Sequence, residues 1–206
     1  QDNDGFIWFG TRNGLNRYDG KNFLLFTRQH NGMQDNKVVQ LATDNDNHLF
    51  IAYGATINAR ALNGRVDVMD MATHQVKRIT EVLGKMPFKE SDITWLSGDG
   101  TGNIIWVTRN PYRVWQYDQQ KGFKLRIEIG NNIPGMDTTV AFSDYTARNS
   151  LFRYGFMVLA IAPGRWYFVD KHTVLPFTII GNQAVVGIDQ QKNMLLLDRD
   201  AGNKLI

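Results

Sequence analysis

Five arginines stand in equivalent loops of a repeating strand pattern, and they are the residues with the clearest chemical use. Planar guanidinium groups suit carboxylate and sulfate oxygens, and flat aromatic faces nearby can stack on sugar rings. If the repeats are arranged radially, these loops lie at one rim of a central channel and predict a site for an acidic oligosaccharide. The residues that make up this candidate ligand-binding site are Arg12, Arg60, Arg109, Arg165 and Arg199, with Tyr53, Tyr112 and Trp166. The alternative is that the arginines are ordinary exposed loop residues that cap strands or pair with neighbouring aspartates.

Other side chains offer less chemistry. Carboxylates recur after the first strand of each repeat, in turns on the opposite face, at Asp44, Asp99, Asp144 and Asp189. Paired catalytic acids converge in a cleft, so we interpret these aspartates as turn formers and expect no catalytic residue. The segments 2–5 and 44–47 lack the spaced third ligand and the distant glutamate of a calcium loop. The histidines show no ligand spacing, and we expect neither a metal nor a cofactor.

Composition indicates an ordinary globular chain rich in strands. Of 206 residues, 43% are hydrophobic and 12% aromatic, and 19 glycines against 5 prolines favour glycine and Asn/Asp turns. A net charge of +3 is too small to indicate nucleic-acid binding. The absence of cysteine excludes disulfides and thiolate metal sites. The longest apolar run, Phe156–Ala162, is far too short to span a bilayer.

The strand pattern recurs with a period of about 40–50 residues, which is typical of a four-stranded propeller blade. Each full unit has an aspartate turn, an apolar strand, a glycine turn and a second aspartate before its last turn. That second marker is Tyr18-Asp19, Met69-Asp70, Tyr117-Asp118 and Val169-Asp170. The approximate units are 1–36, 37–91, 92–136, 137–182 and an incomplete 183–206.

These units predict an all-β fold, a β-propeller segment of four-stranded antiparallel blades that spans residues 1–206. About four to five blades are present, and the first lacks its innermost strand while the fifth lacks its outermost. This predicts one segment of a larger ring, and the alternative is a ring that the chain closes alone. A β-sandwich is the rival architecture, but it does not require this repeated order of turns. We expect insertions at 53–64 and 145–154, the fourth unit's first strand at 139–143, and an edge strand around Pro176.

The opening repeat resembles the two-component regulator propeller family. The resemblance rests on Asn3–Thr11 and Gly14–Gly20, and again on Gly102–Thr108 with Tyr117-Asp118. In that family, seven-bladed propellers form the periplasmic sensor region of hybrid histidine kinases in polysaccharide-degrading Gram-negative bacteria. A β-sandwich, a membrane helix and cytoplasmic kinase, receiver and DNA-binding modules follow there. None of those modules is in this chain, so the chain itself is not expected to be an enzyme.

The resemblance implies an extracytoplasmic, periplasmic sensor segment that recognises an oligosaccharide and regulates polysaccharide use. Its expected partners are that ligand, the remaining blades of the same protein and a second copy in a homodimeric receptor, with no nucleic acid. Two other functions remain open from the residues: a scaffold or dimerisation module without a small ligand, and a propeller glycosidase or polysaccharide lyase. Fold alone does not choose among them.

Overall fold

The strands of the described residues form five antiparallel sheets in which consecutive strands are neighbours. The computed structural model describes residues 1–2, 4–54, 62–109, 111, 113–128, 151–153, 156–162, 165–169, 174–178, 183–189, 191, 193–198 and 204–205. The first two sheets are β1 (Ile7–Thr11), β2 (Gly14–Tyr18), β3 (Phe23–Phe26) and β4 (Val38–Thr43), β5 (His48–Gly54), β6 (Leu62–Asp70), β7 (Val76–Arg78). The third is β8 (Ile93–Gly98), β9 (Ile104–Thr108), β10 (Arg113–Asp118), β11 (Gly122–Glu128). The last two are β12 (Leu151–Arg153), β13 (Phe156–Ala162), β14 (Arg165–Val169), β15 (Val174–Thr178) and β16 (Gln183–Ile188), β17 (Met194–Asp198), β18 (Lys204–Leu205).

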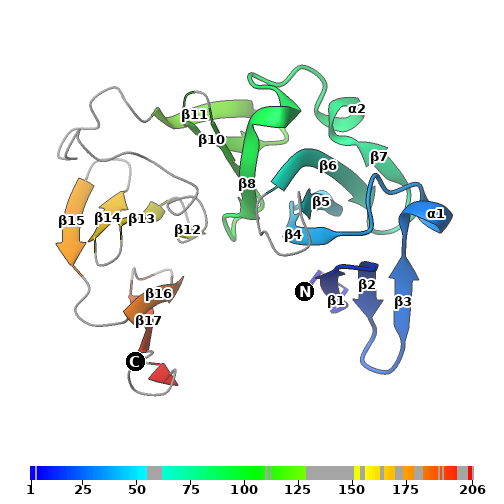
Figure 1. The fold of residues 1–206 in the computed structure, drawn as a ribbon, viewed down its shortest axis with the longest axis horizontal. Helices are drawn as coiled ribbons and strands as arrows, with labels where there is room; N and C mark the ends of the chain where they lie inside the picture. Colours follow the sequence, from blue (N-terminus) through cyan, green and yellow to red (C-terminus); the bar gives the residue numbers. More distant parts are fainter. Residues whose placement is uncertain are drawn as a thin grey trace.

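The five sheets stand one after another around an arc, with the first and last at its two ends (Figure 1). The strands β4, β8, β12 and β16 lie nearest the centre, and each begins its sheet. Neighbouring sheets contact each other in chain order, β1 with β4, β4 with β8, β8 with β12 and β12 with β16. This radial arrangement of four-stranded antiparallel units confirms the β-propeller that the repeat predicts.

Strand positions follow the sequence pattern closely in the first three units. The sequence pattern predicts strands at 23–26, 38–43 and 104–108, and β3, β4 and β9 have these bounds. Pro176 lies in β15, which is an edge strand as expected. The fourth unit differs, because β12 lies at Leu151–Arg153, inside the insertion expected at 145–154, while the expected strand at 139–143 falls outside the described residues. A three-residue strand carries too little alternation to be recognised from sequence. The insertion at 53–64 is also shorter than expected, since β6 begins at Leu62.

The part of the chain that the structure describes also has two short helices and one 3-10 turn that were not expected, and all three lie in connections between sheets. They are α1 (Arg28–Asn31), α2 (Ile79–Leu83) and η1 (Glu90–Asp92). The Thr27 side chain accepts a hydrogen bond from the backbone N–H of His30, and Gly32 ends the helix in the left-handed region with φ 70°. No helix among the described residues is long and apolar enough to cross a membrane.

The core lies between sheets, and the alternation of β5 shows how it is built. Leu49 and Ile51 face the first sheet, where they meet Leu15 and Phe26. Phe50 and its neighbours on the other face of β5 meet the third sheet. Every residue of β5 from Leu49 to Gly54 is buried, as expected for a strand covered on both faces.

Aspartates close the hairpins at one end of the blades, which confirms their interpretation as turn formers. The Asp44 carboxylate accepts from the backbone N–H of Asp46 and of His48, both at 2.9 Å. Asp99 accepts in the same way from Thr101 and Asn103. Asp2 and Asp189 occupy the same position in their sheets, whereas Asp144 lies outside the described residues. A second set of aspartates closes the hairpin between the last two strands of each of the first three sheets, at the same end of the blades. These are Asp19, Asp70 and Asp118.

Candidate ligand-binding site

The opposite end of the blades carries the loops that sequence analysis selected. Because consecutive strands are antiparallel, the loop between the second and third strands of a blade lies at the same end as the connection to the next blade. The loops β1–β2, β5–β6, β9–β10, β13–β14 and β17–β18 therefore share this end with the connections 27–37 and 79–92. We call it the loop end, as distinct from the aspartate end.

The structure describes the side chains of only some of the predicted site residues. Arg12 is exposed in the β1–β2 turn, and Arg109 is exposed directly after β9. The backbones of Arg165 and Trp166 open strand β14. Arg60, Tyr112 and Arg199 lie outside the described residues. No hydrogen bond or ion pair between described residues joins Arg12 to Arg109.

A hollow of about 350 Å³ opens beside Arg109 at the loop end. Its walls come from the connection between the second and third sheets and from the ends of β9 and β10 that face each other across the β9–β10 loop. The residues that line it are Met86, Pro87, Phe88, Lys89, Asp92, Thr108, Arg109, Pro111 and Arg113. It therefore combines apolar surface with three cations and one carboxylate.

The three cations of the hollow differ in how they are paired. Arg113 donates from Nε and Nη2 to the two carboxylate oxygens of Glu128, at 3.0 and 3.3 Å. Arg109 donates from Nη2 to the carbonyl oxygen of Ser91, at 3.3 Å. Neither Arg109 nor Lys89, which is exposed, forms an ion pair with another described residue. These two cations are thus placed to receive an anionic group.

Buried contacts hold the walls of the hollow in place. The backbone N–H of Arg109 donates to the carbonyl of Asp92 at 2.9 Å, which ties the β9 end to the connection. Thr108 is 2% exposed, and its hydroxyl accepts from Nε1 of Trp115 at 3.2 Å. The Phe88 ring lies 5.8 Å from Trp115 and 5.3 Å from Phe123, so the connection is anchored on the third sheet.

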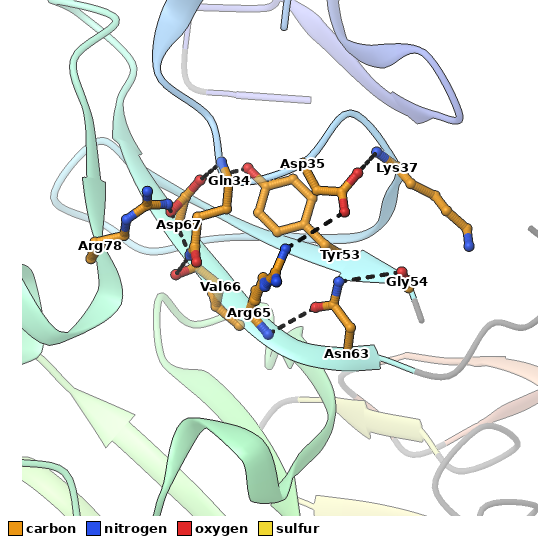
Figure 2. A network of polar contacts seen from close by, with 10 residues as sticks. All are labelled: Gln34, Asp35, Lys37, Tyr53, Gly54, Asn63, Arg65, Val66, Asp67 and Arg78. Atoms are coloured by element: carbon orange, nitrogen blue, oxygen red, sulfur yellow. Dashed lines mark hydrogen bonds and ion pairs between the residues drawn. The ribbon is translucent and has the colours of Figure 1, made fainter. Parts of the chain in front are cut away.

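Tyr53 lies in a buried polar network and not at an open surface. Its side chain is buried, and its hydroxyl donates to the Asp67 carboxylate at 2.7 Å (Figure 2). That carboxylate, which is 0% exposed, also accepts from the backbone N–H and the side-chain amide of Gln34, both at 2.8 Å, and from Arg78 at 3.1 Å. Burial and the adjacent Asp67 charge raise the pKa of Tyr53 far above its usual range. The ring of Tyr53 is therefore not available for stacking on a sugar.

The same buried charge affects the connection that forms the hollow. Burial, and then the Asp67 carboxylate, raise the pKa of Glu90, while Arg78 opposes the shift. Among the described residues, no group of three or more histidines, aspartates or glutamates is placed to hold a metal ion. The hollow is lined by three cations, one carboxylate and apolar side chains.

Sequence reasoning found Arg109 but missed Lys89, Phe88 and Thr108. Arg109 was recognised because its loop repeats from blade to blade. Thr108 ends strand β9. The segment Lys85-Met-Pro-Phe-Lys-Glu90 carries Phe88 and Lys89, and it shows no repeat or strand pattern. Phe88, which follows Pro87 and lies between Lys85 and Lys89, is the feature of this segment that could have indicated a loop anchored by an aromatic side chain.

Comparisons with known proteins identify the architecture. No protein-family model matches the chain, and no curated protein matches it. One extracellular domain of a hybrid two-component system from B. thetaiotaomicron matches with a TM-score of 0.59 at 20% identity, over 95% of this chain and 26% of that one. A second such domain from B. thetaiotaomicron matches with a TM-score of 0.52 at 13% identity, over 100% and 35%. A streptogramin B lyase matches with a TM-score of 0.58 at 13% identity, over 100% and 62%.

At these identities the likeness shows the fold alone, and it agrees with the propeller repeat of the opening segment. The chain spans about a quarter to a third of the two extracellular domains and 62% of the lyase. Two of these neighbours are extracellular domains of hybrid two-component systems, the kind of protein whose propeller the opening repeat resembles.

Proposed function

We propose that this chain is part of an extracytoplasmic sensor propeller that binds an acidic oligosaccharide at the loop end. The observation that carries the proposal is the hollow of about 350 Å³ in which Lys89 and Arg109 are exposed and unpaired with any described carboxylate. Guanidinium and ammonium groups bind carboxylate and sulfate oxygens. Apolar side chains from Met86 and Phe88 lie beside them and suit the less polar faces of a sugar ring.

The other loop arginines extend this proposal around the rim. Arg12 directly follows β1 in the equivalent loop of the first blade, and Arg60, Arg165 and Arg199 belong to the equivalent loops of the second, fourth and fifth by sequence. Tyr112 and Trp166 are the proposed aromatic partners. We place the chain in the periplasm, within a homodimeric receptor that transmits ligand binding and carries out no catalysis in this segment. The two sensor domains with the same fold, together with the sequence resemblance, support this role.

Calorimetric titration of the parent chain and Arg109→Ala tests the site. The ligands are a galacturonate tetrasaccharide and the matching neutral galactose tetrasaccharide. We expect the parent to prefer the acidic sugar, and Arg109→Ala to weaken that binding about tenfold, or about 1.4 kcal/mol. Lys121→Ala is the control, because Lys121 lies at the aspartate end and is 83% exposed.

The result that would contradict the site is equal affinity of the parent and Arg109→Ala for the acidic sugar. The scaffold alternative would be favoured if the parent chain bound neither sugar, nor any other sugar in a glycan panel, and formed a stable dimer. Shortening of the acidic sugar during the titration would favour the lyase or glycosidase alternative. Added salt should weaken the acidic sugar's binding, since exposed charges are screened.

A further inference from the structure

The hollow at the loop end holds charges of both signs that do not pair with each other. Lys89, Arg109 and Asp92 line the same space of about 350 Å³. Among the residues that the structure describes, none of these three forms an ion pair, and no group donates a hydrogen bond to the Asp92 carboxylate. The remaining charge in the lining, Arg113, is already neutralised by Glu128. Two unpaired cations therefore share the hollow with one unpaired carboxylate.

The backbone that carries Asp92 is held from two sides. The Asp92 carbonyl oxygen accepts the backbone N–H of Arg109 at 2.9 Å, and the Asp92 N–H donates to the carbonyl of Lys89 at 3.0 Å. On its other side, η1 lies so close to Gly64 of β6 that a Cβ there would come within 2.8 Å of the Cα of Ser91. Gly64 has φ 80°, a conformation that suits glycine. The backbone of Asp92 therefore has a fixed place beside Arg109.

The chemistry of a carboxylate differs from that of its two cationic neighbours. An ionised carboxylate only accepts hydrogen bonds, and a sugar hydroxyl can donate to it in a short, strong bond. A sulfate ester at that hydroxyl removes the donor and brings a like charge against Asp92, which is unfavourable. Arg109 and Lys89 bind carboxylate and sulfate alike, so the cations alone do not distinguish between the two kinds of anionic sugar.

We propose that Asp92 is a specificity-determining residue, which makes the hollow select a sugar with one carboxylate and free hydroxyls over a sulfated sugar. This inference rests on the proposed function, because it concerns the same ligand site. The sugar's carboxylate binds Arg109 and Lys89, and its hydroxyls donate to Asp92. With Arg113 neutralised, the lining carries one net positive charge, which matches a uronate residue and not a sugar that carries several sulfates.

Calorimetric titration with two ligands that share a backbone tests this role. They are the galacturonate tetrasaccharide and the same tetrasaccharide with its hydroxyls sulfated. We expect the parent chain to bind the unsulfated form at least about tenfold more tightly. A site made of cations alone would give the opposite order, because Coulomb attraction grows with the charge of the ligand. The order of the two ligands in the parent therefore tests the proposal without any variant.

Asp92→Asn removes the charge and keeps the shape of the side chain and one acceptor oxygen. We expect this variant to reduce the preference for the unsulfated form at least about tenfold, chiefly because the sulfated form binds it more tightly than it binds the parent. Asp46→Asn is the matched control, because it removes the same charge from the exposed β4–β5 turn at the aspartate end. The control should keep the preference of the parent.

The outcomes separate this inference from the proposed function. If the parent binds the sulfated form as tightly as the unsulfated one, or more tightly, Asp92 does not select the ligand, and the anion site itself still stands. A preference that Asp92→Asn leaves unchanged would overturn the role of Asp92 in the same way. Binding of neither form by the parent would overturn the proposed function, and this inference with it.

Discussion

Replacing Asp67 with alanine should destabilise the protein by about 3 kcal/mol, because it removes the acceptor on which a buried network depends. The carboxylate is 0% exposed and receives four hydrogen bonds, from the Tyr53 hydroxyl, from the Gln34 backbone and side chain, and from Arg78 (Figure 2). These donors come from β5, β7 and the connection that follows the first sheet. The network therefore ties the first blade to the second.

The magnitude follows from which donors lose their partner. The Tyr53 hydroxyl is buried and the Gln34 N–H is partly buried, and a buried donor without an acceptor costs about 1–3 kcal/mol. Arg78 is 45% exposed and can turn to water, so its loss adds little. The alanine variant also avoids the cost of burying a carboxylate. The total loss of unfolding free energy therefore stays at about 3 kcal/mol. For a chain of this length that lowers Tm by roughly 6–12 °C.

Urea unfolding followed by tryptophan fluorescence measures this loss. Tyr53→Phe removes one donor but leaves the carboxylate with three, so we expect a smaller loss of about 1–2 kcal/mol. Asp35→Ala is the matched control, because Asp35 is 37% exposed and lies 4.0 Å from Arg65 in an exposed ion pair. A loss for Asp67→Ala no larger than that of Asp35→Ala would refute the reasoning.

Three further changes test local features of the fold. Gly10→Val should destabilise by about 1–3 kcal/mol in urea unfolding, since its side chain would collide with Val38 where the first two sheets meet. Asp99→Ala should cost about 2–3 kcal/mol and speed amide exchange in its hairpin, because this 2% exposed carboxylate accepts two backbone N–H groups. His74→Gln should reduce the loss of stability between pH 7.5 and pH 5.5, two conditions that bracket the usual histidine pKa of about 6.5.

The sign of the histidine effect follows from its partner. Arg17 can only donate, and its Nη1 lies 3.0 Å from Nε2 of His74, so the ring must be neutral to accept. Burial, and then the Arg17 charge, lower the pKa of His74 in the folded protein, while Asp70 opposes them. The pKa of His74 is therefore lower in the folded protein than in the unfolded chain. Neutral His74 contributes its stability above the unfolded-state pKa, and this contribution is lost as the pH falls through that value toward the folded-state pKa. Glutamine keeps an acceptor without titrating, and an unchanged pH dependence would contradict this role.

Controls separate the other two local predictions from general fragility. Asp118→Ala removes a turn carboxylate that is only partly buried, so its loss of stability should be clearly smaller than that of Asp99→Ala. Equal losses for the two would show that burial of Asp99 is not the cause. A fully stable Gly10→Val would show that the first two sheets are not in close contact at that point.

Much of the fold was accessible from sequence because the hairpins are local. The turn aspartates, the apolar strands beside them and the glycine turns lie within about a dozen residues of each other, and their repetition indicated blades. Helix α2, η1 and strand β12 were missed because neither a repeat nor a clear alternation marks them. The connection between α2 and η1 is anchored by contacts distant in sequence, those of Phe88 with Trp115 and Phe123.

The candidate site was predictable only where it repeats. Arg109 was found from its loop position, but Lys89 joins it because a long connection folds back over the end of β9. Tyr53 was expected at the surface as the last residue before a loop. Its place in the alternation with Leu49 and Ile51 indicates the buried face instead, and the structure puts it there.

Radical footprinting with the galacturonate tetrasaccharide tests the central claim most directly. Met86 and Phe88 line the hollow and have side chains that hydroxyl radicals oxidise, while Phe23 in β3, which is 64% exposed, serves as the internal reference. A saturating acidic sugar should slow oxidation of Met86 and Phe88 in the parent chain, leave Phe23 unchanged, and lose this effect in Arg109→Ala. Protection at the aspartate end, or protection of Met86 that persists in Arg109→Ala, would contradict the assignment of the loop end as the ligand-binding site.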